Sequence, residues 1–318
     1  MVSLLDVEAA ARRLAGVVAR TPLVESSHLH ELTGVRVGLK CENLQRTGSF
    51  KLRGAYNFIS RLLPKVVSMG LVTYSSGNHA QAVAMAARVR GAPVTVVMPE
   101  TVPDVKRRGA ERLGAEIVVE GTTSLERRAK AEEIAIERKM TIVPPFEHPD
   151  IVAGQGTVGL EIADSVERLD MVLVPIGGGG LAGGVAAAIK ALRPEARVIG
   201  VEPEGAASMK AALKAGGPVE LESIDTVADG LAPVIAGELT YLHASTLLDD
   251  IVTVSDDDIL KAAAHLMACE KLVVEYSGAA TVAAIMSGTV KTEDLRVVAV
   301  LSGGNIDPKA IRTLDLDI

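Results

Sequence analysis

The sequence predicts an α/β fold made of two open, twisted, mostly parallel sheets, with a ligand site in the cleft between them. Short Val/Ile-rich runs alternate with Ala-rich helical patterns along the chain. Repetition of strand, helix and strand is typical of parallel sheets with helices on both faces. Polar or glycine-rich loops follow several of the runs. A length of 318 residues fits one large domain or two modest ones.

The predicted strands are short, and the predicted helices between them carry apolar residues at helical spacing. The strands cover residues 35–40, 71–74, 94–98, 116–119, 141–143, 171–176, 197–201, 250–254 and 297–301. The helices include residues 80–89, 105–113, 124–139, 181–191 and 256–268. Ser255 and three following aspartates favour a helix start, because they cap free N–H groups and suit the helix dipole.

The spacing of these units indicates two domains. Residues 1–60 and 148–318 are expected to form a large domain, and residues 61–147 a small one. The pair Pro144 and Pro145 marks one boundary. A cleft between two α/β domains is a favoured place for a ligand.

Composition excludes several classes of function. The net charge of -7 argues against a nucleic-acid partner, which requires a basic surface. Cys41 and Cys269 are too few for a disulfide framework and indicate a reducing compartment. No basic segment precedes an apolar run at the N-terminus, and no apolar stretch is long enough for a membrane span. We therefore expect a cytoplasmic protein without a membrane partner.

Residues 49–55 hold a lysine, Lys51, inside a small and mostly apolar stretch that follows the turn-prone Arg46, Thr47 and Gly48. A partly buried lysine loses solvation, so its ammonium gives up a proton more easily. A neutral amine is what an imine-forming nucleophile needs. This segment predicts a nucleophilic lysine.

Residues 171–184 read as a strand, a glycine turn and a helix. Four glycines let the backbone turn sharply and present several N–H groups, to which the helix N-terminus adds positive potential. The turn therefore predicts a phosphate site. It is formed by Gly177, Gly178, Gly179 and Gly180, with Leu181 next in the chain.

The same turn also fits a dinucleotide-binding fingerprint. Gly178, Gly180 and Gly183 have the required spacing, and Glu202 ends the next predicted strand where a ribose-binding acid is expected. This segment alone leaves both interpretations open.

Three further places carry polar side chains at strand ends. Ser75, Ser76 and Asn78 lie over a predicted helix N-terminus, which suits an anion such as a carboxylate; simple N-capping is the alternative, but it requires only one such residue. Ser302 follows the strand 297–301 and would face the crevice where open sheets bind ligands. Glu275 ends an apolar run and needs a partner, either a structural ion pair or a cofactor.

With these motifs in this order, the chain resembles the fold type II pyridoxal-phosphate (PLP) enzymes, the tryptophan-synthase-β superfamily. Within it, the chain looks like the threonine dehydratase and serine racemase family. The resemblance covers nearly the whole chain. Further family-like stretches are residues 20–23, 40–45, 49–55, 153–157 and 228–230.

The resemblance implies a role for each candidate. Lys51 would carry the cofactor as an imine and, once released, act as base on the substrate Cα–H. The other cofactor contacts would come from Phe50 against the ring, Asn78 at the ring hydroxyl, Gly177 to Gly180 with the Leu181 N–H at the phosphate, Ser302 at the pyridine nitrogen, and Glu275 nearby. The substrate carboxylate would be received by Ser75, Ser76, Asn78 and His79. In serine racemases the serine matching Ser76 reprotonates Cα from the opposite face.

A serine at the pyridine nitrogen leaves that nitrogen largely unprotonated, which weakens the electron sink and favours prompt β-elimination. The expected reaction converts L-threonine to 2-oxobutanoate and ammonia, and L-serine to pyruvate. Alternatives are a serine racemase or a dehydratase of another 3-hydroxy amino acid such as 3-hydroxyaspartate. A dinucleotide-binding protein is the alternative from a different class.

The resemblance also bears on a cation, on length and on assembly. Racemase-type relatives bind a divalent cation through a Glu-x-x-x-Ala-x-Asp motif, whose positions here are Glu202, Ala206 and Ser208. Serine in place of aspartate removes an anionic ligand, so a divalent or monovalent cation there stays open. The chain looks like a short form without the isoleucine-sensing regulatory domain. It is expected to form a homo-oligomer, a dimer or tetramer, with an amino acid as its small-molecule partner.

Overall fold

The computed structural model describes residues 1–75, 77–102, 104–292, 294–312 and 314–316, and contains two sheets. The larger sheet has the order β1 (Leu23–Ser26), β2 (Arg36–Cys41), β10 (Arg296–Leu301), β7 (Met171–Pro175), β8 (Arg197–Pro203) and β9 (Asp250–Val254). The smaller sheet has the order β5 (Glu116–Val119), β4 (Val94–Met98), β3 (Leu71–Tyr74) and β6 (Thr141–Ile142). Neighbouring strands are parallel, except that β1 is antiparallel to β2. The predicted α/β class with mostly parallel sheets is confirmed.

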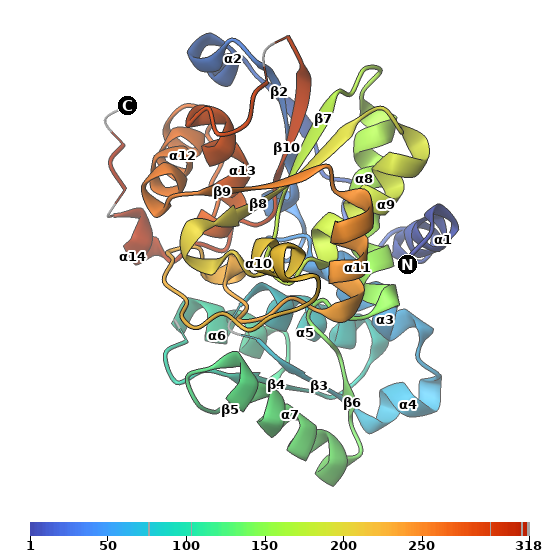
Figure 1. Cartoon of the computed structure of the whole chain (residues 1–318). Coiled ribbons are helices and arrows are strands. Elements are labelled where there is room, and N and C mark those ends of the chain that lie inside the picture. Colours follow the sequence, from blue (N-terminus) through green and yellow to red (C-terminus); the bar gives the residue numbers. More distant parts are fainter. Residues whose placement is uncertain (76, 103, 293, 313, 317–318) are drawn as a thin grey trace.

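Helices cover both sheets, and the two sheets lie one above the other in Figure 1. The helices are α1 (Leu4–Leu14), α2 (Ser27–Thr33), α3 (Lys51–Arg61), α4 (Pro64–Met69), α5 (Asn78–Arg90), α6 (Asp104–Arg112), α7 (Ser124–Arg138), α8 (Pro149–Ser165), α9 (Gly180–Leu192), α10 (Ser208–Ala215), α11 (Glu238–Leu247), α12 (Asp256–Ala268), α13 (Tyr276–Met286) and α14 (Pro308–Ile311). Three single 3₁₀ turns are η1 (Glu42–Leu44), η2 (Glu204–Ala206) and η3 (Asp229–Leu231).

The strand predictions agree with the structure to within two residues at each end. Strands β3, β4, β5 and β9 have the predicted limits. Ser255 caps α12 as expected, since its side chain accepts a hydrogen bond from the Asp258 N–H. The sequence reasoning missed β1, a four-residue edge strand without clear alternation of buried and exposed positions. All strands of the smaller sheet fall between residues 71 and 142, while the domain limits themselves stay a prediction.

Helix α8 runs through three glycines, Gly154, Gly156 and Gly159, which are unfavourable inside a helix. The structure supplies the reason. A Cβ on Gly154 would lie 2.6 Å from the Arg53 carbonyl oxygen on α3, and one on Gly156 would lie 2.8 Å from the Gly184 carbonyl oxygen on α9. The glycines let α3, α8 and α9 pack at backbone distance. This packing fixes the N-terminal end of α3, where Lys51 is the first residue.

A buried ionic cluster also fixes the position of α3 through Arg53. Arg53 is fully buried and donates to both carboxylate oxygens of Glu42, each at 2.8 Å. Its other guanidinium N–H groups reach Glu161 at 2.7 and 3.0 Å, and Lys40 also pairs with Glu161. Burial is the largest single influence and pushes the pKa of Glu42 upward, but the charges of Arg53 and Lys40 and the hydrogen bonds from Arg53 and Thr21 together keep this pKa below its usual value. The cluster therefore stays ionised.

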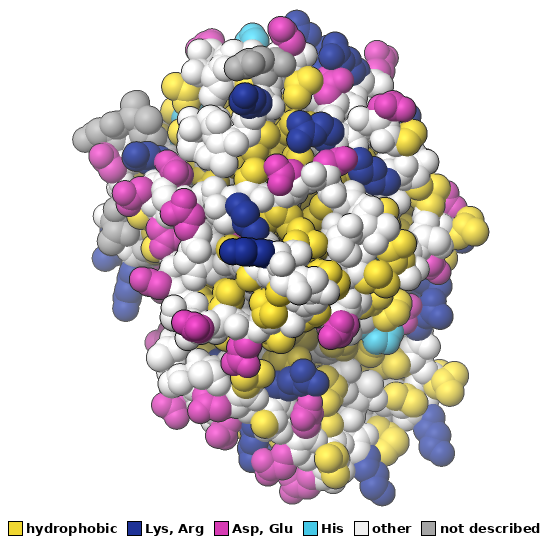
Figure 2. Space-filling view, viewed as in Figure 1, with side chains coloured by type: hydrophobic (Ala, Val, Ile, Leu, Met, Phe, Trp, Pro, Cys, Tyr) yellow, Lys and Arg dark blue, Asp and Glu magenta, His cyan; other side chains and the backbone are white. Residues whose placement is uncertain are grey.

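The surface carries charges of both signs. On the face in Figure 2, Lys and Arg side chains are interspersed with Asp and Glu, and no large patch of one sign forms. Among the described residues, none of the helices combines the length and the apolar character that crossing a membrane requires.

Candidate functional site

One cavity lies between the two sheets and collects nearly all predicted site residues. It is bordered by the first turns of α3, α5 and α9 and by the segments that follow β3, β7 and β10. The predicted residues that line it are Phe50, Lys51, Ser75, Asn78, His79, Gly177, Gly178, Gly179, Gly180, Leu181, Glu275 and Ser302. Ser76 lies outside the described residues. Segments far apart in the sequence thus meet at one place.

Lys51 points into this cavity from the start of α3. Its Nζ donates a hydrogen bond to the Pro145 carbonyl oxygen at 3.0 Å and lies 5.2 Å from the centre of the Phe50 ring. Burial lowers the pKa of Lys51 to about 8, although the nearby Glu275 carboxylate opposes the shift. A sizeable fraction of the amine is therefore neutral near neutral pH, which an amine needs in order to attack a carbonyl.

The glycine turn joins β7 to α9 and leaves a row of backbone N–H groups without helical partners. The first helical bond of α9 runs from the Gly183 N–H to the Gly179 carbonyl, so the N–H groups of residues 180–182 are free of helical acceptors. Gly179 has a φ of 84°, a left-handed conformation that favours glycine. A Cβ on Gly178 would lie 2.2 Å from the Phe146 ring. Such a buried helix start suits a phosphate.

The polar loop before α5 does more than cap the helix. The capping residue is Gly77, which offers no side-chain cap, and Ser75 Oγ accepts a hydrogen bond from the Gly77 N–H at 3.2 Å. The side chains of Ser75 and Asn78 therefore do not cap α5, while Ser76 lies outside the described residues. The N–H groups at the start of α5 face a cavity with positive helix potential, an arrangement that fits a carboxylate.

His79 lies in the first turn of α5 and is buried. Its Nε2 lies 3.1 Å from the Val143 carbonyl oxygen, so this nitrogen carries the ring proton. Burial and the Lys51 charge lower the pKa of His79 to about 3. A neutral imidazole gives no charge to a carboxylate, so His79 could serve the anion mainly through its backbone N–H.

Ser302 and Glu275 also line the cavity. Ser302 is the first residue after β10, it is 4% exposed, and its hydroxyl has no partner within the part of the chain that the structure describes. Glu275 accepts a hydrogen bond from Asn78 Nδ2. Burial raises the pKa of Glu275 to about 7, against the charge of Lys106, which favours ionisation. Glu275 lines the cavity instead of forming a structural ion pair with a described residue.

Glu202 is turned away from this cavity. Its two oxygens accept hydrogen bonds from the N–H groups of Met209 and Lys210, at 2.8 and 2.9 Å, and so cap the start of α10. Burial raises the pKa of Glu202 to about 7. Among the described residues, no group of three His, Cys, Asp or Glu side chains is placed to hold a metal ion. A cation held by Glu202 and the Ala206 carbonyl therefore stays a prediction from the sequence.

The dinucleotide interpretation loses its acid for the same reason, because Glu202 does not line the cavity. Gly183 has a packing role, since a Cβ there would lie 2.9 Å from the Cβ of His243 on α11. The glycine turn is thus left as a phosphate site without a ribose site beside it.

Sequence reasoning missed several residues that border the cavity. Lys106 of α6 pairs with Asp229 of η3 across it, and Phe146 lies against the glycine turn. Gln155 of α8 also lines it and accepts a hydrogen bond from the Gly54 N–H. Lys106 stands among other charged residues, and the stretch 228–230 does not show which partner Asp229 has, so only the contact across 123 positions reveals this pair.

The residues present fit pyridoxal phosphate. The free N–H groups of the glycine turn suit its phosphate, the partly neutral Lys51 suits its aldehyde, and the unpaired Ser302 hydroxyl suits a ring nitrogen. Each of these groups can still form a bond to a ligand, because the described residues do not use all of its hydrogen-bonding capacity.

Comparisons with known proteins agree with this fit. A family model described as "Pyridoxal-phosphate dependent enzyme" matches residues 14–303. The L-threonine ammonia-lyase of Thermotoga maritima is 43% identical over 311 residues, covering 98% of this chain and 77% of that protein. The crystal structure of a threonine deaminase from T.th. superposes with a TM-score of 0.90 at 42% identity, covering 96% and 99% of the two chains. Maize serine racemase gives a TM-score of 0.94 at 35% identity, covering 98% and 96%.

Proposed function

Because the chain belongs to the family of pyridoxal-phosphate-dependent enzymes, we propose that it is an ammonia-lyase for L-threonine. It would release 2-oxobutanoate and ammonia from L-threonine, and pyruvate and ammonia from L-serine. The observation that carries the proposal is the combination of a partly neutral Lys51 with a hydroxyl, Ser302, and not an acid, at the position that the resemblance assigns to the ring nitrogen. The names of the relatives at 40–43% identity support the same reaction.

The chemistry divides between cofactor and protein. Bound pyridoxal phosphate supplies the electron sink that makes the substrate Cα–H acidic. The Lys51 amine takes the Cα proton, since it is the partly neutral base in the cavity. Ser75, Asn78 and the start of α5 hold the substrate carboxylate by N–H and hydroxyl groups. Ser302 would leave the ring nitrogen of the cofactor largely unprotonated and so weaken its electron sink. A weaker sink favours prompt loss of the β-hydroxyl group over a long-lived carbanion.

Serine racemisation is the second candidate. The similarity to maize serine racemase favours it. The resemblance places at Ser76 the proton donor on the opposite face of Cα, which racemisation needs. The same serine occurs in dehydratases, so its presence favours neither activity.

The experiment measures 2-oxo acid release from L-threonine and from L-serine by the cofactor-loaded protein, together with D-serine formation. Rapid release of 2-oxobutanoate supports the proposal. D-serine without 2-oxo acid would replace it with racemisation. Silence toward both substrates would leave another 3-hydroxy amino acid, such as 3-hydroxyaspartate, as the next candidate.

Cofactor uptake should depend on pH through Lys51. The aldehyde reacts with the neutral amine, so the uptake rate of the cofactor-free protein should rise about tenfold per pH unit below the Lys51 pKa of about 8 and level off above it. The Glu275 charge opposes the lowered pKa, so Glu275→Gln should move this curve to lower pH. Stopped-flow absorbance measures the rate. A rate independent of pH between about 6.5 and 9 would contradict the role given to the Lys51 amine.

The glycine turn gives a second prediction. In Gly178→Ala the new Cβ would lie 2.2 Å from Phe146 Cδ1, so the ring or the turn must move. Since overpacking costs about 1–3 kcal/mol, we expect cofactor affinity to fall about tenfold or more. Gly217→Ala is the matched control, because nothing lies within 4 Å of its Cβ. Titration of the cofactor-free proteins compares them, and equal affinity would argue against a phosphate at this turn.

Assembly into a homo-oligomer and a cytoplasmic location stay predictions from the sequence. The two free cysteines support the location. Sedimentation of the purified protein would measure the oligomer size.

A further inference from the structure

A chain of hydrogen bonds runs through the cavity wall and ends on Glu275. Asn305 Nδ2 donates to the Thr47 carbonyl oxygen at 2.9 Å and to Asn78 Oδ1 at 2.7 Å. Asn78 Nδ2 in turn donates to Glu275 Oε1. The chain joins the loop before α3, the loop after β10, the start of α5 and the segment before α13.

The direction of every bond in this chain is fixed from its ends. A backbone carbonyl accepts only, so the Asn305 amide must turn its nitrogen toward Thr47. The same nitrogen also faces the Asn78 side chain, so the Asn78 atom that accepts this bond must be Oδ1. The Asn78 nitrogen is thereby directed at the Glu275 carboxylate, an acceptor when ionised. Neither asparagine amide can rotate by 180° without facing a donor with a donor or an acceptor with an acceptor.

Close packing holds these side chains in place. A Cβ on Gly303 would lie 2.1 Å from Glu275 Oε1, and one on Gly48 would lie 2.5 Å from Asn305 Oδ1. Gly48 also has a φ of 71°, which favours glycine. The backbone there is bonded across the same gap, from the Gly304 N–H to the Gly48 carbonyl at 2.8 Å. The hydrogen-bonded residues Thr47, Asn305, Asn78 and Glu275 are therefore closely packed, and we call this group the seam.

Asn78 keeps one N–H group that this chain does not use. Its nitrogen carries two hydrogens, of which Glu275 takes one. Asn78 also lines the cavity. The group it can offer to a ligand beside it is therefore a hydrogen-bond donor.

We propose that Asn305 and Glu275 are positioning residues that orient the Asn78 amide, so that Asn78 donates an N–H group to the ring oxygen of the bound cofactor. This inference rests on the proposed function and on the contact between Asn78 and the ring hydroxyl that the family resemblance implies. A donor stabilises the ionised form of that oxygen. The seam, and not Asn78 alone, would thus set the protonation state of the ring.

The test records the absorption spectrum of the pyridoxal-phosphate-loaded protein against pH, without substrate. Asn305→Asp is nearly isosteric but cannot donate to Asn78 Oδ1. We expect the Asn78 amide to rotate so that its nitrogen donates to Asp at position 305 and no longer to the ring oxygen. The pH of the spectral change should rise by about one unit, the size of a lost hydrogen bond to a charged group. If the ring oxygen of the wild-type protein stays ionised over the whole measured pH range, the spectral change should become visible within that range in the variant. Glu275→Gln keeps an acceptor oxygen and should shift it less than Glu275→Ala.

Two controls separate positioning from a general structural effect. Asn43→Ala removes another amide of the same wall, one that donates to the Val273 carbonyl at 3.1 Å without touching Asn78, and should leave the spectral change in place. In an Asn78→Ala background, Asn305→Ala should have no further effect, since this variant adds no charge near the ring and acts only through the missing amide.

A wild-type spectrum in Asn305→Asp, or an Asn305→Ala shift that is equally large with and without Asn78, would overturn the proposal. If Asn305→Asp does not fold, Asn305→Ala carries the same expectation and the same contrary outcome. Groups that also face Glu275 are Lys51, Lys106 and Asp229, whose charges the asparagine variants leave unchanged. The test measures no turnover. A protein that does not convert L-threonine would contradict the proposed function but could still show the spectral shifts expected for Asn305 and Glu275.

Discussion

Replacing Lys51 with alanine should lower kcat/KM for L-threonine by about 10³-fold or more. The side chain is both the predicted attachment point of the cofactor and the base for the Cα proton, and general base catalysis alone contributes about 10²–10⁴-fold. Steady-state release of 2-oxobutanoate measures the loss. Lys65→Ala, on the exposed side of α4, is the matched control and should keep full activity. Activity of the Lys51 variant within about tenfold of wild type would contradict the mechanism.

Removing Arg53 should produce the largest loss of stability. Arg53→Met leaves the fully buried Glu42 without its ion-pair partner and with only the hydrogen bond from the Thr21 hydroxyl, and it leaves Glu161 with Lys40 alone. Breaking a buried ion pair by removing one partner costs about 3–5 kcal/mol. We expect the free energy of unfolding in urea to fall by that amount. Arg53→Lys should recover only part, because an ammonium cannot form the fork that reaches two carboxylates.

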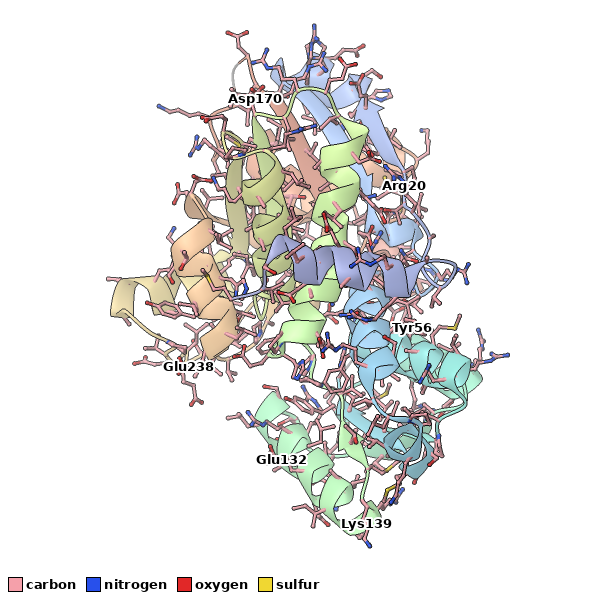
Figure 3. The ribbon with its side chains drawn as sticks, turned by 90° about the vertical axis from the view of Figure 1, so that its right-hand side faces the viewer. Arg20, Tyr56, Glu132, Lys139, Asp170 and Glu238 are labelled. Atoms are coloured by element: carbon pink, nitrogen blue, oxygen red, sulfur yellow. The ribbon has the colours of Figure 1, made fainter. Side chains whose placement is uncertain are left out.

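Arg20→Met provides the control for this experiment. Arg20, labelled in Figure 3, lies on the outside and pairs with Asp164, with side chains 57% and 70% exposed. Exposed pairs contribute about 0–1 kcal/mol, so this variant should unfold nearly as the wild type does. Similar losses for Arg53→Met and Arg20→Met would show that the buried cluster does not stabilise α3 as described.

The sequence predicts most of the sheet and loop structure because those signals are local. Runs such as residues 94–98 are apolar on both faces, as central parallel strands require, and the structure gives them the predicted limits. The glycine turn and Ser302 follow strand ends, and parallel strands bring such ends to one edge. Nearly all candidate residues thus converge on one cavity without any knowledge of distances.

What could not be predicted depends on contacts between distant segments. Helix α8 contains glycines that local propensity disfavours, and only its contact with α3 and α9 explains them. Asn305 lies in the loop after β10, and its importance comes from a bond to Asn78, 227 positions away. Glu202 looked like a ligand by spacing, while its two oxygens serve the backbone of α10. No local pattern encodes these pairings.

The most direct test of the account is to reduce the cofactor-loaded protein with borohydride and map the labelled peptide by mass spectrometry. Reduction makes the link between cofactor and amine permanent. We expect the added mass on the peptide that contains Lys51, and none in Lys51→Ala. Lys106 also borders the cavity, so label on Lys106, or an unlabelled Lys51 in a yellow protein, would contradict the assignment of Lys51 as the residue that holds the cofactor.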